Sequence, residues 1–550
     1  MNGSAPQKKT NKILFVAAFI IMLSMAFFQC YKSTHDLNWA PDPDFDRDIA
    51  FVRGTLEGHY GKDPNYAGEY IWYNPLLFSI EAVIIKISSL PPNLITVRAG
   101  TYLNVLGPIA FFMMVFSLFG IETALAAALS FLFLSSGNIL SWGAATYSPR
   151  LYPVCFTQFL FYLNIILCYK AFSRQKYFWF ILLGTAIGIS FLGHAAPAII
   201  IILILITIQG QQMFNSFKEK NYASLKKYML QGIWAFVFFI MAAMPLVYYI
   251  VGKYHLHMIT RAAFEYTEGI YYLSNFKGMI RENLSVSFVI AIIGLLWFYK
   301  NFHQQLLRKI IFSWLFISAV MYIYATLVAL LDTRYHIHLP GTVPSFHYFF
   351  YLKALQSVFF GFGFVFLFNL FIKWSGNLIA GNNKGLQITN SANIFFVVIV
   401  MICALAYFPF YKNRDDFGLF RKESAEKENK KDDIEVYDYI LKNISSEKVI
   451  LSEKDPSIFP VMATARKMVS IAYTFSNPYV DFDKREEDRN NMLLFLKTGE
   501  PVSSKQLFSK YSVDYALISK KELSDYKMLP PILDKAIFSN NSYTLFSINK

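Results

Sequence analysis

The sequence predicts a polytopic α-helical membrane protein, with about eleven spans, that ends in a soluble α/β domain. Three observations predict this class. Hydrophobic residues make up 55% of the 550 residues and charged residues only 16%, whereas soluble domains average roughly 25% charged residues. Long apolar runs recur along the first 412 residues, and the composition then changes to that of a soluble domain. This combination excludes a disordered chain, a fibrous repeat and an ordinary soluble enzyme.

The formal net charge of +14 belongs to the membrane region. From Asn413 to Lys550 the chain holds 22 Lys and Arg against 22 Asp and Glu, so this part is neutral. The excess alternates between loops, which is typical of membrane topology and not of a nucleic-acid-binding patch. The four cysteines lie in or beside apolar runs without a CxxC spacing. We therefore expect neither a disulfide framework nor a zinc site built from cysteines.

A membrane-spanning helix needs about 20 mainly apolar residues. The expected spans are 12–31, 98–118, 121–140, 151–170, 177–193, 195–210, 229–251, 286–299, 310–331, 346–372 and 393–411. A break at Gly193-His194-Ala195-Ala196-Pro197 separates the fifth span from the sixth. Because Gly and Pro interrupt helices, we interpret it as the tip of a helical hairpin; one kinked helix is the alternative.

Charge also predicts the orientation of the spans. If the N-terminus is inside, the inside loops and the adjoining helix ends carry fifteen Lys and Arg against two acidic residues, Glu122 and Glu219. The outside loops are nearly neutral. This bias predicts a cytoplasmic N-terminus and, with an odd number of spans, a C-terminal domain outside. We expect the first span to be a retained anchor, because it lacks a small-residue cleavage site. A bacterial inner membrane is the expected location.

The first outside loop, residues 32–97, contains the densest group of acids near a predicted membrane surface. Asp42, Asp44, Asp46 and Asp48 fall within seven residues. An amphipathic helix at about 46–58 should follow. A second, apolar helix should then run to about residue 89 and lie along the bilayer surface.

At this point the chain resembles the GT-C superfamily of membrane glycosyltransferases. The resemblance is carried by a loose pattern in the first outside loop, in which the matching residues are Phe51, Leu56, Gly58 and Tyr60, followed by Tyr73, Pro75 and Leu76. The span count, the two surface helices and the soluble C-terminal domain also fit. The resemblance implies transfer, with inversion, of a sugar from a polyprenyl-phosphate donor to a glycan, lipid or protein acceptor outside the cytoplasm.

Transfer of a sugar to a hydroxyl requires a base for the hydroxyl proton, and a carboxylate can serve. Comparison with the family pattern favours Asp44, then Asp42, then Asp46. The alternative is a solvated acidic turn in which Asp46 caps the helix. The same three aspartates can also be considered as ligands of a divalent cation, Mg²⁺ or Mn²⁺, because hard cations favour clustered oxygens.

The leaving lipid phosphate needs positive or hydrogen-bonding neighbours. The candidates at the outer ends of spans are Lys353, Arg150, His194, His347 and Arg334. Lys353 is the sharpest of these, because a charge inside an apolar span indicates function by default, although it can also snorkel without a role. The alternatives are an interface anchor for Arg150 and a structural histidine for His194.

Three further residues are expected to contact substrate: Tyr73 and Tyr60 in the first loop, and His336 before the tenth span. His336 and His338 would face one way on an extended segment. A His-x-His pair can bind metal, but no third ligand can be placed from the sequence.

After a charged linker at 413–431, the pattern at 432–550 becomes α/β. We expect helices at 432–443, 484–497 and 503–510, and strands at 448–452, 467–472, 513–519 and 543–548. The stretch 473–483 is expected to be a surface loop, with acceptor contact as the alternative.

Two other functions remain open from the sequence. The chain can be a non-catalytic membrane scaffold or assembly protein of similar architecture, or a transporter. A transporter should show internal repeats and broken helices with charges at mid-membrane, and the sequence shows no clear repeat.

Overall fold

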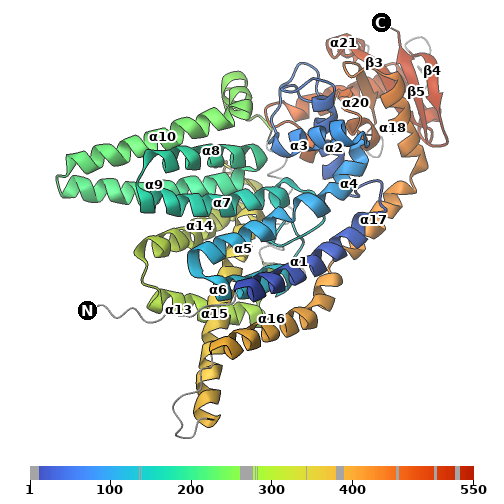
Figure 1. Ribbon diagram of the computed structural model, residues 1–550. Coiled ribbons are helices and arrows are strands. Elements are labelled where there is room, and N and C mark those ends of the chain that lie inside the picture. The colour runs from blue at the N-terminus through green and yellow to red at the C-terminus, as the bar shows by residue number, and fades with distance from the viewer. Residues whose placement is uncertain are drawn as a thin grey trace. The chain divides into compact units, whose positions relative to one another are not determined.

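The computed structural model describes residues 12–549 apart from 135–136, 138, 261–276, 279, 282, 342, 380–388, 454–457, 501–503 and 527–532. The middle of the segment 252–285, which separates the expected spans 229–251 and 286–299, therefore lies outside the described residues. The chain divides into two compact units. We call Met1–His35, Ala99–Ala242 and Tyr271–Leu419 the helical unit, and Asp36–Arg98, Ala243–Ile270 and Phe420–Lys550 the mixed unit. Each is described by itself (Figure 1).

The apolar helices follow the predicted spans closely. They are α1 (Lys12–Thr34), α5 (Leu106–Phe119), α6 (Ile121–Leu129) with the π-helical turn η1 (Ser130–Leu134), α7 (Pro153–Arg174), α8 (Tyr177–Gly193), α9 (Ala195–Lys218), α10 (Tyr222–Val247) with the π-helical turn η2 (Tyr248–Lys253), α13 (Val286–Asn301), α14 (Gln305–Tyr335), α15 (Phe346–Ile379) and α16 (Thr389–Lys412).

Within the described ranges, eight helical segments are long and apolar enough to cross a membrane. Three shorter apolar helices cover 121–134, 177–193 and 286–301. Together they match the predicted spans one for one. The prediction of a multi-pass α-helical membrane protein is confirmed.

The break between the fifth and sixth predicted spans is a hairpin tip. His194 lies between α8 and α9 in an extended conformation, and its Nδ1 accepts a hydrogen bond from the Ala196 amide at 3.2 Å. Helices α8 and α9 contact each other along their lengths (Figure 1). The alternative of one kinked helix was therefore wrong, because a kinked helix would not fold back along itself.

Helices α13 and α15 approach closely because glycines face the partner backbone. A Cβ atom on Gly294 would lie 1.8 Å from the Phe359 carbonyl oxygen, and one on Gly363 would lie 2.1 Å from that of Ile290. Small residues at a membrane helix crossing allow such contact.

The first long loop begins the mixed unit with α2 (Pro43–Leu56), α3 (Leu76–Ser88) and the start of α4 (Pro92–Leu103). Gly58 follows α2 with φ 83°, a left-handed conformation that glycine adopts without strain. Phe51 is buried in α2 and stacks on Phe78 of α3, with 5.1 Å between ring centroids. Residues of the family-like pattern therefore end α2 and hold it against α3.

The C-terminal part forms a five-stranded sheet of β1 (Val449–Ser452), β2 (Lys467–Met468), β3 (Val513–Ser519), β4 (Leu533–Ser539) and β5 (Tyr543–Ile548). The order is β2-β1-β3-β5-β4. β1 pairs in parallel with β2 and β3, whereas β5 pairs antiparallel with β3 and β4. The helices of this part are α17 (Gly418–Glu428), α18 (Lys431–Asn443), α19 (Ile458–Met462), α20 (Phe482–Thr498) and α21 (Lys505–Lys510).

The predicted strands and the helices at 432–443, 484–497 and 503–510 all have counterparts here. Three elements differ from prediction. Helix α19 was not predicted. Strand β4 was missed because Asp534 and Lys535 interrupt its apolar pattern. Residues 413–431, predicted as a charged linker, contain helix α17.

The first loop and the sheet belong to one unit because the loop hydrogen-bonds to a sheet edge. The Met468 amide of β2 donates to the Asn65 carbonyl at 2.7 Å, and the Asn65 side chain donates to the Met462 carbonyl at 3.1 Å. Tyr66 is fully buried in the core on one face of the sheet. The loop bearing the aspartates is thus held by the soluble part of the chain.

Candidate active site

The acidic cluster forms the first turns of α2. Asp42 is the N-cap residue, and its side chain accepts a hydrogen bond from the Asp44 amide at 2.9 Å, with Pro43 following it. Asp and Pro are favoured at these two positions. The alternative that Asp46 caps the helix was wrong, because the helix begins one turn earlier than predicted.

Helical spacing divides the four aspartates between two directions. Asp44 and Asp48, four residues apart, share one partner, Arg47, whereas Asp42 and Asp46 line a pocket on another side. The cluster therefore does not converge on one point.

Arg47 is the centre of the first pair. Its Nη1 lies 2.8 Å from Asp44 Oδ1, and its Nη2 and Nε donate to Asp48 Oδ1 at 2.7 and 2.9 Å. The guanidinium carbon lies 4.2 Å from the ring centroid of Tyr73 and 5.6 Å from that of Phe475. Cation–π contacts of this kind fix the guanidinium plane. Tyr73, a predicted substrate residue, thus supports the arginine that holds Asp44.

Of the two aspartates paired with Arg47, Asp44 is more accessible to solvent than Asp48. Its side chain is 37% exposed, whereas that of Asp48 is 1% exposed. Loss of hydration raises the pKa of Asp44 to about 6, against the opposing attraction of Arg47. A carboxylate with a pKa nearer to neutrality is a better general base than an ordinary surface aspartate.

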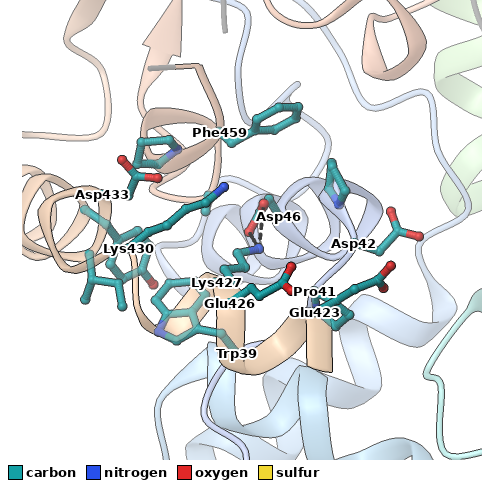
Figure 2. A pocket seen from close by; sticks show the side chains of 15 residues that line it. Trp39, Pro41, Asp42, Asp46, Glu423, Glu426, Lys427, Lys430, Asp433 and Phe459 are labelled. Carbon is teal, nitrogen blue, oxygen red and sulfur yellow. Dashed lines mark hydrogen bonds and ion pairs between the residues drawn. The ribbon is translucent and has the colours of Figure 1, made fainter. Parts of the chain in front are cut away.

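Asp46 differs from Asp44 in both burial and partner. Its side chain is 4% exposed, and Lys427 of α17 donates to its two carboxylate oxygens at 2.7 and 2.8 Å. Figure 2 shows this ion pair on one wall of a cavity of about 490 Å³. A carboxylate held in this way is poorly placed to accept a proton from a substrate.

The rest of the cavity mixes charge with aromatic surface. Acidic residues, a second lysine, aromatic rings and prolines line it, all from the mixed unit (Figure 2): Asp42, Asp433, Glu423, Glu426, Lys430, Trp39, Tyr437, Phe459, Pro41, Pro43 and Pro460. Its volume lies within the range of small-molecule sites, roughly 300–1,000 Å³. Hydroxyl groups of a polar ligand can donate to its carboxylates.

The helical unit brings two of the predicted phosphate residues together. The rings of His194 and His347 lie 4.4 Å apart between centroids, although 152 residues separate them in the chain. Within the described part of the chain, His347 Nδ1 is buried without a hydrogen-bond partner. Such a nitrogen can serve a ligand group.

Lys353 is 1% exposed and lies on α15, the helix that carries His347. Its Nζ donates to the side-chain oxygens of Asn283 and Gln356, the latter at 2.9 Å. Both acceptors are oxygens of side-chain amides.

The other predicted residues lie elsewhere. Arg150 is buried beside Asp416, with 3.4 Å between Nε and Oδ1, and Arg414 pairs with the same carboxylate. Arg334 and His336 are exposed at the C-terminal end of α14. In the mixed unit, Tyr60 donates its hydroxyl to the Pro245 carbonyl at 3.1 Å.

Sequence reasoning missed three residues of this site: Arg47, Asp48 as its partner, and Lys427. The first two carried a local signal, because Asp44 and Arg47 are three residues apart on a predicted amphipathic stretch, a spacing that favours ion pairs. Lys427 carried none, since 381 residues separate it from Asp46.

Solved structures with similar folds decide the fold family. ArnT from Cupriavidus metallidurans in the apo state aligns over 97% of both chains, with 13% identity and a TM-score of 0.53. The same protein bound to undecaprenyl phosphate gives 12% identity, the same coverage and a TM-score of 0.51. The chain has the GT-C fold.

A second GT-C structure agrees with this result. The apo oligosaccharyltransferase of Archaeoglobus fulgidus aligns over 93% of this chain and 70% of that chain, with 12% identity and a TM-score of 0.51. No protein-family model and no curated protein matches the sequence. The GT-C resemblance predicted from the first loop is confirmed at the level of fold.

The expectation of a metal ion can be tested on the donor atoms of the three aspartates. The archaeal oligosaccharyltransferase has also been solved in complex with Zn and sulfate. Here, Lys427 donates hydrogen bonds to both carboxylate oxygens of Asp46. Asp42 Oδ1 accepts a hydrogen bond from the Asp44 amide, and Arg47 forms an ion pair with Asp44. The described residues contain no group of three His, Cys, Asp or Glu placed to hold a metal ion. In this arrangement Asp42, Asp44 and Asp46 do not fit a shared cation.

A buried glutamate behind the site predicts how stability depends on pH. Glu81 of α3 accepts a hydrogen bond from Thr96 at 2.9 Å, and burial raises its pKa from 4.5 to about 8, with the charge of Asp48 adding to the shift. Folding therefore takes up a proton. This contribution to stability is complete below about pH 4.5 and is lost as the pH rises through about 8.

We expect Glu81→Gln, which keeps an acceptor for Thr96, to reduce the difference in melting temperature between about pH 5 and about pH 8. The measurement is thermal unfolding of the full-length protein in detergent at both pH values. An unchanged difference in the variant would show that Glu81 does not bind the proton.

Proposed function

We propose that this chain is an integral membrane glycosyltransferase that transfers a sugar from a polyprenyl-phosphate donor to a glycan, lipid or protein acceptor outside the cytoplasm. The observation that carries the proposal is Asp44: a partly exposed carboxylate with a raised pKa, held by Arg47 at the start of α2 in a GT-C fold. The undecaprenyl phosphate bound to a protein of similar fold supports the class of donor.

In the proposed reaction, the acceptor hydroxyl attacks the anomeric carbon as its proton passes to Asp44. The new C–O bond forms while the bond from that carbon to the phosphate oxygen breaks. The bonding electron pair leaves with the polyprenyl phosphate, and attack from the opposite side inverts the anomeric carbon. No metal ion enters this sequence of bond changes.

The leaving phosphate gains negative charge and needs a cation. Lys353 is our candidate, because its buried ammonium group lies on an apolar helix and donates hydrogen bonds to side-chain oxygens, and an ammonium group can bind a phosphate in the same way. His194 and His347 are second candidates, because the structure places their rings together. We also propose that the protein lies in a bacterial inner membrane, with the N-terminus cytoplasmic and the C-terminal domain outside.

The lipid end of the donor provides a test that does not depend on the sugar. We expect purified full-length protein to bind undecaprenyl phosphate saturably, and Lys353→Met to weaken binding about 10- to 100-fold, the range for a lost charged hydrogen bond. The measurement is a titration followed by intrinsic fluorescence.

The matched control is Lys373→Met, which removes an exposed lysine from the same helix and should leave the affinity unchanged. Equal affinities for wild type and Lys353→Met would remove Lys353 from the phosphate site. If the wild type bound no polyprenyl phosphate, whatever the length of the lipid, the proposed donor class would be wrong and a scaffold would be favoured.

A further inference from the structure

Arg47 divides its hydrogen-bonding groups unequally between two carboxylates. The Nε–Nη2 edge faces Asp48, and both nitrogens donate to the same oxygen, at 2.9 and 2.7 Å. Asp44 receives only Nη1, at 2.8 Å. An arginine normally offers a carboxylate two parallel hydrogen bonds. Here Asp48 occupies the Nε–Nη2 edge, and Asp44 accepts from Nη1 alone.

Aromatic rings against the guanidinium, together with the hydrogen bonds at its edge, fix the orientation of the Arg47 side chain. Tyr73 and Phe475 lie 4.2 and 5.6 Å from it, and Arg47 is buried. A planar guanidinium against aromatic rings loses freedom to rotate out of that plane. The division of its hydrogen bonds is therefore a property of the packed site.

This division affects how basic Asp44 can be. An adjacent Arg lowers a carboxyl pKa by 1–3 units, and more hydrogen bonds to the charged form lower it further. We propose that Asp48 is a positioning residue for Asp44, acting through Arg47: it holds the Nε–Nη2 edge of the guanidinium, so that Asp44 is oriented by one hydrogen bond from Nη1 and remains basic. The inference rests on the proposed role of Asp44 as the base.

A contribution to the stability of the fold does not by itself explain why an aspartate occupies position 48. Its Oδ2 is buried and has no hydrogen-bond partner among the described residues. An unsatisfied buried acceptor is unfavourable, and the charge of Asp48 also raises the pKa of Glu81. The charged groups that act on Asp44 are Arg47 and Asp42; those that act on Asp48 are Arg47, Asp44 and Asp42.

The test measures the pKa of Asp44 directly, without substrate. Carboxyl-stretch infrared titration of the full-length protein, with Asp44→Asn subtracted, isolates this group. We expect Asp48→Asn to lower the pKa of Asp44 by about one unit or more, because Arg47 then turns its free edge to Asp44. The acid limb of the transfer rate should move by the same amount, with kcat about tenfold lower and KM unchanged.

A double-mutant cycle separates this role from direct repulsion between the carboxylates. In an Arg47→Lys background the side chain has no bidentate edge, so Asp48→Asn should shift the pKa of Asp44 less than half as far. Tyr73→Leu removes one ring that holds the guanidinium in its plane and leaves both carboxylates in place. It should also lower the pKa of Asp44, and it tests the inference if Asp48→Asn does not fold.

The control is Glu57→Gln, which removes the carboxylate partner of Arg466 at the end of the same helix and should leave the pKa of Asp44 in place. An unchanged pKa in Asp48→Asn, or an equal shift in the Arg47→Lys background, would overturn the inference while leaving the proposed function intact. Absence of transfer by the wild type would instead count against the function, and the infrared result would stand.

Discussion

Replacing Asp44 by Asn is expected to reduce glycosyl transfer by about 10²- to 10⁴-fold, the range for loss of a general base. Asn has the same shape but cannot accept a proton at neutral pH. The measurement is the release of polyprenyl phosphate, a product common to every sugar and acceptor, from a panel of polyprenyl-phosphate sugars at saturating donor.

The pH profile gives this prediction a second readout. A general base must be deprotonated, so wild-type activity should rise with pH through about 6, the pKa of Asp44 in the folded protein. The residual activity of Asp44→Asn should lack this acid limb.

The neighbouring aspartates provide the matched controls. Asp42→Asn keeps a good helix cap, because Asn and Asp cap helices about equally well, and should retain activity within about tenfold. Asp46→Asn removes a carboxylate already bound by Lys427, and its effect should be on stability. If Asp42→Asn abolished transfer while Asp44→Asn did not, the base would be Asp42. Full activity in all three variants, with native folding, would show that none of these aspartates is the base, and absence of transfer by the wild type would favour a scaffold.

The second large effect is expected from breaking the ion pair between Asp46 and Lys427. Asp46 is 4% exposed and Lys427 21% exposed at the side chain, so neither group is fully hydrated. Removing one partner of such a pair is destabilising by about 3–5 kcal/mol, because the remaining charge stays buried. We therefore expect Lys427→Met to destabilise the contact between α2 and α17 by about that amount.

Hydrogen exchange of the peptides covering 43–56 and 418–428 measures this local free energy of opening in the full-length protein. The destabilisation caused by Lys427→Met should grow with pH, since Asp46 can become neutral by binding a proton at low pH. A second substitution, Asp46→Asn, should recover part of it.

Lys422→Met is the matched control on the same helix. Lys422 pairs with Glu426 at 3.9 Å, and both side chains are exposed, so its loss should change stability by less than about 1 kcal/mol. Equal protection in Lys427→Met and Lys422→Met would mean that the buried pair does not hold α2 in place.

The sequence was sufficient for features that depend on local composition. The eleven apolar helical segments, eight of them long enough to cross a membrane, follow from runs of apolar residues that need an apolar environment. The hairpin tip at His194 and the strands β1, β3 and β5 follow from local breaks and alternation in the same way. The start of α2 was predicted one turn too late, although its signal, Asp42 followed by Pro43, is formed by residues adjacent in the chain.

Only the tertiary structure showed which aspartate is paired with which cation and how exposed each one is. Lys427, 381 residues away in the chain, takes Asp46, and Arg47 lies between Asp44 and Asp48 because Tyr73 and Phe475 hold its plane. The contact of His194 with His347 likewise joins distant helices. Sequence alone places ionisable groups along the chain, but their hydration and their partners depend on which distant segments pack against them, and these determine which carboxylate can act as a base.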